Sequence, residues 1–182
     1  MVKSTQLSIS GAWVFQSPVY CDSRGHFRES FKEAEIREQL KREFNVTHAS
    51  FSNSKKGVIR GIHFNRASKG QAKWISCTSG KLWDVVVDIR PNSPTFRKWE
   101  AVELSADDGK SLFISEGLGH AFLALEDETV TAYLFTAQYS PADEIVIYPL
   151  DKDLAIQWPN IPMIISERDA SAPTLDEFLK SL

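Results

Sequence analysis

Short apolar runs that alternate with turn residues, from Val46 onwards, constrain the fold of this chain more than any other feature. The runs are of strand length and rich in valine, isoleucine, phenylalanine and tryptophan, which favour pleated, half-buried surfaces. Many short strands at regular spacing are typical of an all-β sandwich, jelly roll or barrel. The predicted strands cover residues 46–52, 57–64, 73–78, 81–89, 99–104, 111–115, 121–125, 129–135 and 145–148.

Residues 30–44 form the strongest helix prediction in the chain. They open with the S-x-x-E spacing of a capping box, Ser30 to Glu33, and continue with an apolar residue at every fourth position. A second, short helix is predicted at about residues 173–182. Because no repeat, low-complexity segment or linker divides the sequence, we expect one domain over residues 1–182.

The size and net charge of the chain limit the kinds of molecule that it is expected to bind. The 182 residues, of which 42% are apolar, are enough to bury a substantial core. A formal net charge of −3 gives no electrostatic reason to expect nucleic acid. No apolar run approaches the roughly 20 residues of a membrane span, and the N-terminal segment lacks the apolar core of a signal peptide. We therefore expect a cytoplasmic protein that binds neither nucleic acid nor membrane.

Several kinds of site leave no signature in the sequence. The two cysteines have no CxxC spacing, so we expect both to be reduced. The histidines form no HxH, HExxH or HxxxH group, although histidines distant in sequence can meet in a fold. No P-loop, GxGxxG turn or GxSxG elbow is present, so we expect no metal, no cofactor and no serine nucleophile. The four histidines are His26, His48, His63 and His120.

Residues 57–73, GVIRGIHFNRASKGQAK, place three basic side chains among apolar residues and glycines. Arg60 and His63 would lie on opposite faces of a regular strand, unless Gly61 introduces a bulge. A loop is predicted after this strand, and a hairpin through it would bring Lys73 back towards His63. The alternative interpretation is a hydrogen-bonded core histidine with cations on a solvated face.

The remaining residue types suit acid–base chemistry at a carbonyl group. A histidine such as His63 can act as a base near neutral pH, and a carboxylate can orient it. Lys73 could stabilise a developing oxyanion, and a strand tyrosine such as Tyr133 could deliver a proton. Alternatively, Tyr133 packs in the core with its hydroxyl on a backbone group. Spacing alone does not show that these side chains meet.

A series of longer motifs runs in order from about Cys21 to Leu175: RGHFRESF, GVIRGIHF, GQAKWISC, DVVVDIRPNSPTF, ISEGLGHAF, DLAIQWP and SERDASAPTL. Together they resemble the dTDP-4-dehydrorhamnose 3,5-epimerase family of nucleotide-sugar epimerases. The residues of these motifs are closer to the antibiotic-sugar branch of the family than to the cell-wall rhamnose enzymes. The resemblance implies a cupin-type jelly roll or β-sandwich with one or two short peripheral helices. It also implies a homodimer that exchanges N-terminal strands, no metal, and a substrate such as dTDP-4-dehydro-6-deoxyglucose.

The resemblance implies a catalytic role for four residues. His63 resembles the base that removes a proton next to the C4 ketone, and Asp169 resembles its dyad partner. Lys73 resembles the group that stabilises the enolate oxygen, and Tyr133 resembles the acid that returns a proton on the opposite face.

The resemblance also implies a set of substrate-binding residues. Arg60 and His120 resemble ligands of the sugar or the diphosphate, and Tyr139 resembles part of the nucleotide pocket. The remaining members of the set are Arg24, Phe27 and Glu29, which the partner subunit is expected to contribute, together with His48, Ser50 and Arg168.

His48 and Ser50 depart from the family pattern, in which glutamine and asparagine often occupy these positions. Because this segment borders the sugar pocket in the family, the departure bears on which carbon is inverted. We expect inversion at C3, at C5 or at both. Two alternatives remain open from the sequence. One is a cupin-like nucleotide-sugar binding protein with altered catalysis, and the other is a 3,4-ketoisomerase of the same substrate.

Overall fold

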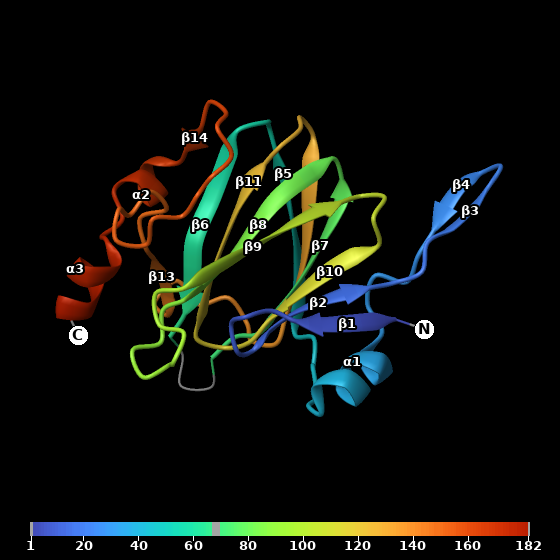
Figure 1. Ribbon diagram of the computed structural model, residues 1–182, viewed down its shortest axis with the longest axis horizontal. Coiled ribbons are helices and arrows are strands. Elements are labelled where there is room, and N and C mark those ends of the chain that lie inside the picture. Colours follow the sequence, from blue (N-terminus) through green and yellow to red (C-terminus); the bar gives the residue numbers. More distant parts are fainter. Residues whose placement is uncertain (1, 67–69, 182) are drawn as a thin grey trace.

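A computed structural model describes residues 2–66 and 70–181 of the chain, which form two β-sheets packed face to face (Figure 1). All strand pairs within the two sheets are antiparallel except the short pair of β14 with β6. The first sheet has the order β1 (Lys3–Gln6), β2 (Ala12–Gln16), β10 (Lys110–Ile114), β7 (Lys73–Ser79), β12 (Thr129–Phe135) and β5 (His48–Ser54). The second has the order β13 (Glu144–Val146), β6 (Val58–Asn65), β11 (Leu118–Ala124), β8 (Lys81–Asp88) and β9 (Trp99–Ser105), with β14 (Ile164–Ile165) beside β6.

Strand β8 shows why its sequence is almost continuously apolar. Leu82 and Val86 point between the two sheets and belong to the central core. Val85 and Val87 point the other way, where the C-terminal segments cover the second sheet with residues such as Leu175. A strand buried on both faces has no need for a polar face. The prediction of an all-β, cupin-type jelly roll is confirmed.

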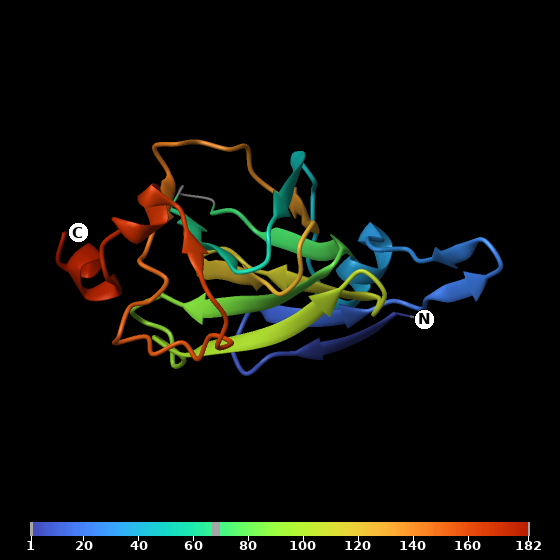
Figure 2. The ribbon, with the colours of Figure 1, turned by 90° about the horizontal axis from the view of Figure 1, so that it is seen from above.

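The helices are short and lie at the periphery. They are α1 (Glu33–Leu40), α2 (Glu167–Ala170) and α3 (Leu175–Lys180). Figure 2 places α2 and α3 at the opposite end of the molecule from the small hairpin of residues 20–27. No helix within the described residues is long and apolar enough to cross a membrane.

The predicted capping box at Ser30 and the predicted helix boundaries are wrong. The helix α1 begins at Glu33 after Lys32, whose side chain makes no capping hydrogen bond, and it ends before Lys41 at a φ of 53°. The Ser30 carbonyl instead accepts a hydrogen bond of 2.8 Å from Trp74 Nε1 on the first sheet. This tertiary contact holds Ser30 outside the helix. A capping box does form at α3, between Thr174 and Glu177.

The expected hairpin between residues 57–64 and 73–78 is also wrong. The two strands, β6 and β7, are consecutive in the chain but belong to different sheets. The connection crosses from one layer to the other, and residues 67–69 of the predicted loop lie outside the described residues. Lys73 therefore reaches His63 across the interior of the sandwich and not along one sheet.

Strand β6 carries a bulge at Gly61, which re-aims its side chains. Its register with β11 pairs His63 with His120 but Arg60 with Phe122, so β6 has one extra residue. Gly61 has a φ of +125°, and a Cβ there would lie 2.6 Å from the His120 carbonyl oxygen. Only glycine fits this conformation and this approach. The bulge lets Arg60 and His63 line the same cavity.

The strand predicted to begin at residue 121 begins earlier, at Leu118, so His120 lies inside β11 and not at a turn. Gly119 favours a turn by composition. In the structure a Cβ at Gly119 would lie 2.6 Å from Ile62 Cγ2, so the glycine serves a close approach between strands.

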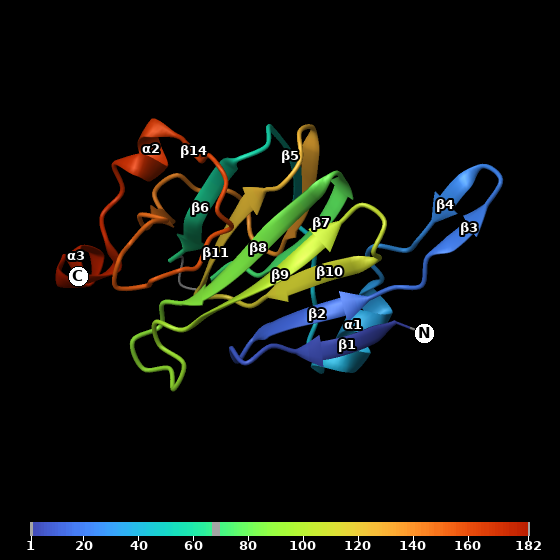
Figure 3. The same cartoon turned by 45° about the horizontal axis from the view of Figure 1, so that its top comes forward.

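The segment after β2 leaves the sandwich as a small hairpin of β3 (Tyr20–Asp22) and β4 (Gly25–Phe27). Figure 3 shows this hairpin projecting from the body of the molecule, beyond the ends of both sheets. Tyr20 and Phe27 are 62% and 65% exposed, which is unusual for aromatic side chains.

Candidate active site

A cavity of about 770 Å³ opens between the two sheets and is lined by residues of β5, β6, β7, β11 and β12 and of the C-terminal segment. Because opposing sheets contribute to it, side chains can approach a bound molecule from two sides. Ten of the predicted site residues line this cavity: His48, Ser50, Arg60, His63, Lys73, His120, Tyr133, Tyr139, Arg168 and Asp169.

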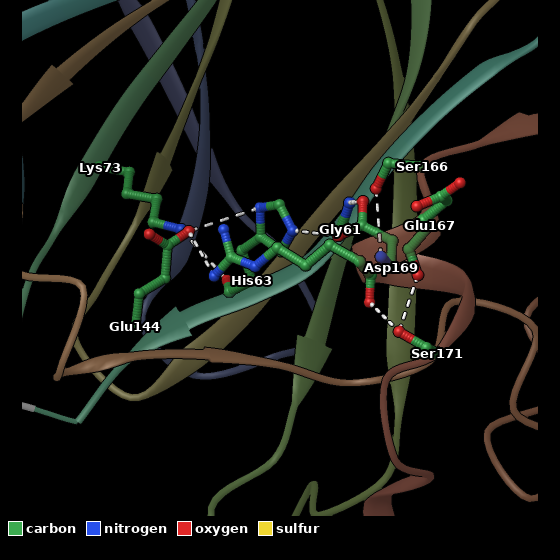
Figure 4. Close-up of polar contacts among 9 residues, drawn as sticks. Gly61, His63, Lys73, Glu144, Ser166, Glu167, Asp169 and Ser171 are labelled. Carbon is green, nitrogen blue, oxygen red and sulfur yellow. Dashed lines mark hydrogen bonds and ion pairs between the residues drawn. The ribbon is translucent and has the colours of Figure 1, made fainter.

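His63 and Asp169 form a hydrogen-bonded pair in the cavity wall (Figure 4). His63 Nε2 lies 2.9 Å from Asp169 Oδ1, and Asp169 Oδ2 accepts a hydrogen bond from the Gly61 amide. Ser166 caps α2 by accepting from the Asp169 amide, which fixes the start of that helix. Burial raises the pKa of Asp169, but the His63 hydrogen bond and charge outweigh it and hold the pKa below its usual range. An ionised carboxylate therefore orients the imidazole.

Lys73 enters the cavity from the opposite sheet. Its side chain is buried, and Nζ donates a hydrogen bond of 3.1 Å to the His63 carbonyl oxygen. Burial lowers the pKa of Lys73 to about 8, although the charges of Glu144 and Asp84 oppose the shift. The ammonium form thus predominates at neutral pH and can stabilise a negative oxygen in the cavity.

Tyr133 stands on β12, in the sheet that faces the His63–Asp169 pair. Its ring is parallel to that of Phe135 at 5.7 Å, and Phe135 in turn stacks on His48 at 4.4 Å. The rings of Tyr133 and His120 are nearly perpendicular, and their centroids lie 6.1 Å apart. Burial raises the pKa of Tyr133 to about 12, so the phenol keeps its proton at neutral pH and can act only as an acid.

His120 and Asp84 form a second buried pair, on adjacent strands β11 and β8. His120 Nε2 lies 2.8 Å from Asp84 Oδ1, and Asp84 Oδ2 has no hydrogen-bond partner among the described residues. Burial lowers the pKa of His120, although the Asp84 carboxylate opposes this. The pair places one ring edge of a histidine at the floor of the cavity.

Glu144 is a further cavity residue that the sequence did not reveal. Its Oε1 lies 3.8 Å from both His63 Nδ1 and a guanidinium nitrogen of Arg168. Figure 4 shows the His63 ring between Glu144 and Asp169. Glu144 directly precedes a predicted strand, but no local pattern indicates that this strand pairs with β6. Asp84, by contrast, stands within an apolar run, which is a usable signal for a buried partnered carboxylate.

The structure does not bring Arg24, Phe27 and Glu29 to this cavity. Arg24 lies on the projecting hairpin and pairs with Asp22, and Phe27 at the base of the hairpin is exposed. Their predicted contribution to a partner's pocket stays a prediction at this point.

The described residues contain no group of three or more histidine, cysteine, aspartate or glutamate side chains placed to hold a metal ion. The groups that do converge are a base with its orienting carboxylate, an ammonium and a protonated phenol. Facing each other across a cavity, these groups can remove a proton beside a carbonyl and return one from the other side. Fold and site thus define a cupin-type jelly roll built for acid–base chemistry.

Comparison with known proteins identifies the family to which the chain belongs. The family model described as dTDP-4-dehydrorhamnose 3,5-epimerase matches residues 6–177, and the chain belongs to this family of isomerases. It is 47% identical to a dTDP-4-dehydrorhamnose 3,5-epimerase of Mycolicibacterium smegmatis, over 94% of this chain and 85% of the relative. It is 41% identical to a dTDP-4-dehydro-6-deoxyglucose 3-epimerase of Streptomyces bikiniensis, over 93% of this chain and 87% of the relative.

A solved structure shows the same architecture. NovW, a 4-keto-6-deoxy sugar epimerase from the novobiocin biosynthetic gene cluster of Streptomyces spheroides, superposes with a TM-score of 0.96 at 37% identity. The match covers 100% of this chain and 91% of NovW. The resemblance read from the motifs is confirmed, and the relatives include epimerases that act at two positions and at one.

Proposed function

We propose that this protein epimerises a dTDP-4-dehydro-6-deoxyhexose, such as dTDP-4-dehydro-6-deoxyglucose, at C3, C5 or both. The observation that carries the proposal is the placement of the His63–Asp169 pair and Tyr133 on opposing sheets around one cavity. An inversion needs a base and an acid on opposite faces of a carbon. The names of the relatives from Mycolicibacterium smegmatis and Streptomyces bikiniensis supply the substrate class, since both are named for dTDP-linked 4-dehydro sugars.

In the proposed reaction His63, oriented by Asp169, removes the proton from the carbon next to the C4 ketone. The electron pair of the C–H bond moves to the ketone oxygen and forms an enolate, which the Lys73 ammonium stabilises. Tyr133 then gives its proton to the same carbon from the opposite face. The raised pKa of Tyr133, about 12, keeps it protonated for this step.

The remaining cavity residues support binding of an anionic nucleotide sugar. Arg60 donates to Ser54 Oγ at 3.1 Å, which fixes the base of its guanidinium near the cavity mouth. Arg168 and the 58%-exposed Tyr139 lie at the rim of the cavity, where a diphosphate and a base could be held. His120 lines the interior of the cavity, where the sugar would lie. His48 and Ser50 line the wall beside Tyr133, so they are placed to affect which carbon is presented.

The test is incubation with dTDP-4-dehydro-6-deoxyglucose in deuterated water, followed by NMR of the product. Deuterium at C3 or C5 with inverted stereochemistry supports the proposal and reports the position. His63→Ala is expected to lose exchange while keeping the thermal unfolding curve of the parent. A carbonyl moved from C4 to C3 would instead identify a 3,4-ketoisomerase. Binding without exchange would identify a binding protein.

We further propose a homodimer in which the hairpin of β3 and β4 enters the partner's site. The support is the exposed aromatic pair Tyr20 and Phe27 on the hairpin, and the 72%-exposed Phe51 on β5. Strand β5 is an edge of the first sheet and borders the cavity, so its unpaired side is open to another strand. Light scattering at several concentrations should give twice the mass of the 20.5 kDa chain. A monomer at high concentration contradicts this proposal.

A further inference from the structure

Two hydroxyl groups next to the phenol of Tyr133 have no part in the proposed reaction. Tyr133 Oη lies 3.4 Å from Ser52 Oγ on the neighbouring strand β5. The hydroxyl of Thr131, two residues before Tyr133, is buried and has no hydrogen-bond partner among the described residues. Strands β5 and β12 pair so that Ser52 stands opposite Thr131. Three hydroxyl groups therefore gather at one place on the first sheet.

Inversion by two different groups leaves the protein in the wrong protonation state for the next turnover. His63 has gained the proton taken from the carbon, and Tyr133 has become a phenolate. Before another cycle one proton must leave His63 and one must reach Tyr133. His63 can release its proton through the open cavity, where its side chain is 26% exposed. Tyr133 lines the same cavity and is half-buried, and the hydroxyl that lies 3.4 Å from its phenol is that of Ser52.

We infer that Ser52 returns the proton to Tyr133 after each inversion. The phenolate takes the hydroxyl proton of Ser52, and Ser52 takes a proton from a water molecule or a buffer acid at the same time. With the proton released by His63, one proton enters and one leaves, so the cycle balances. This inference rests on the proposed function, because it assigns Tyr133 as the acid.

Burial separates the two candidate hydroxyls. Thr131 is fully buried, so it has no direct access to a proton from water, whereas Ser52 is only half-buried. Burial raises the pKa of Tyr133 to about 12, which makes its phenolate a strong base, and the hydroxyls of Ser52 and Thr131 both oppose this shift. Of these two hydroxyls, that of Ser52 lies 3.4 Å from the phenol and is within reach of water, so it is the one through which a proton can return.

The experiment compares the first turnover with later turnovers in the parent and in Ser52→Ala. The first is measured by rapid quench with enzyme in excess over dTDP-4-dehydro-6-deoxyglucose, and the later ones at steady state. In Ser52→Ala the first turnover should stay within about twofold, while steady-state turnover should fall by at least about tenfold. Increasing concentrations of imidazole buffer should restore the steady-state rate, and Ser52→Thr should retain it. Ser105→Ala, a half-buried serine on β9 of the other sheet, should change neither rate.

Equal slowing of both phases in Ser52→Ala, without rescue by buffer, would overturn the relay and leave Ser52 as a group that only holds the phenol. Unchanged steady-state turnover would overturn it as well. Failure of the proposed function has a different signature, since the parent protein would then show no exchange at either carbon. Tyr133→Phe separates the two further, because it should remove the first turnover itself.

Discussion

Lys73 carries its charge in an almost fully buried position, and this predicts an alkaline limit to activity. Its pKa of about 8 means that the ammonium is lost as the pH rises through that value. Since the neutral amine cannot stabilise an enolate, turnover should fall above about pH 8. Lys73→Arg keeps a positive charge at all these pH values, so its rate, although lowered by the larger side chain, should not fall there. Rate profiles that decline alike in both proteins would contradict this assignment.

Asp169→Asn should separate orientation from binding. The amide can still occupy the position next to His63 Nε2 and the Gly61 amide, but it carries no negative charge to stabilise an imidazolium. We expect turnover to fall roughly 10²- to 10⁴-fold with little change in KM. Glu167→Gln is the matched control, because Glu167 is exposed on the same helix. A higher KM with unchanged turnover would show instead that Asp169 serves substrate binding.

The sequence revealed the types of site residues better than their contacts. His63, Lys73 and Tyr133 could be chosen from the chemistry of their side chains, and the family resemblance added Asp169. Glu144 could not be chosen, since its position next to His63 depends on the pairing of β13 with β6. Contacts of this kind join residues that are far apart in the chain, and no local pattern encodes them.

At the scale of elements, strands could be located but not assigned to sheets. The strand at residues 129–135 was predicted with its observed bounds, because β-branched and aromatic residues mark it clearly. The pairing of β6 with β11, in place of β7, follows from which apolar faces meet in the core. The capping box at Ser30 failed for a related reason, since the contact with Trp74 decides the conformation there.

The bulge in β6 predicts a costly substitution at Gly61. A methyl group there would lie 2.6 Å from Ala121 Cα and the His120 carbonyl oxygen, on a backbone that already has a positive φ. We expect Gly61→Ala to lower the free energy of unfolding by about 3 kcal/mol or more, and to abolish activity by displacing His63. Gly25→Ala is the control for the conformation alone, because its φ is +127° but nothing lies within 4 Å of the added methyl.

Denaturant unfolding distinguishes the two effects. Gly25→Ala should cost only about 1 to 2 kcal/mol, the strain of a left-handed backbone. Equal losses in the two variants would show that backbone conformation, and not the contact with β11, requires glycine at position 61.

At the scale of the whole molecule, the sandwich brings groups together that no single sheet could place. His63 lies on the second sheet, whereas Lys73 and Tyr133 lie on the first, and the short helix α2 adds Asp169 from outside the sheets. The cavity is therefore complete only when both layers and the C-terminal segment are in place. The predicted site residues that lie away from this cavity are those on and after the hairpin, Arg24, Phe27 and Glu29.

Mixing two inactive variants tests whether Arg24 serves the partner's site. In a heterodimer of His63→Ala and Arg24→Ala chains, exchange of hairpins would give one site both defects and the other site neither. Random reassociation makes about half of the dimers mixed, so about a quarter of all sites should regain full activity. If Arg24 instead served its own chain, every mixed site would keep one defect and mixing would restore nothing. The two variants are refolded together and separately, and the exchange assay then distinguishes these outcomes. Neither position belongs to the hydrophobic core, so both variants should refold.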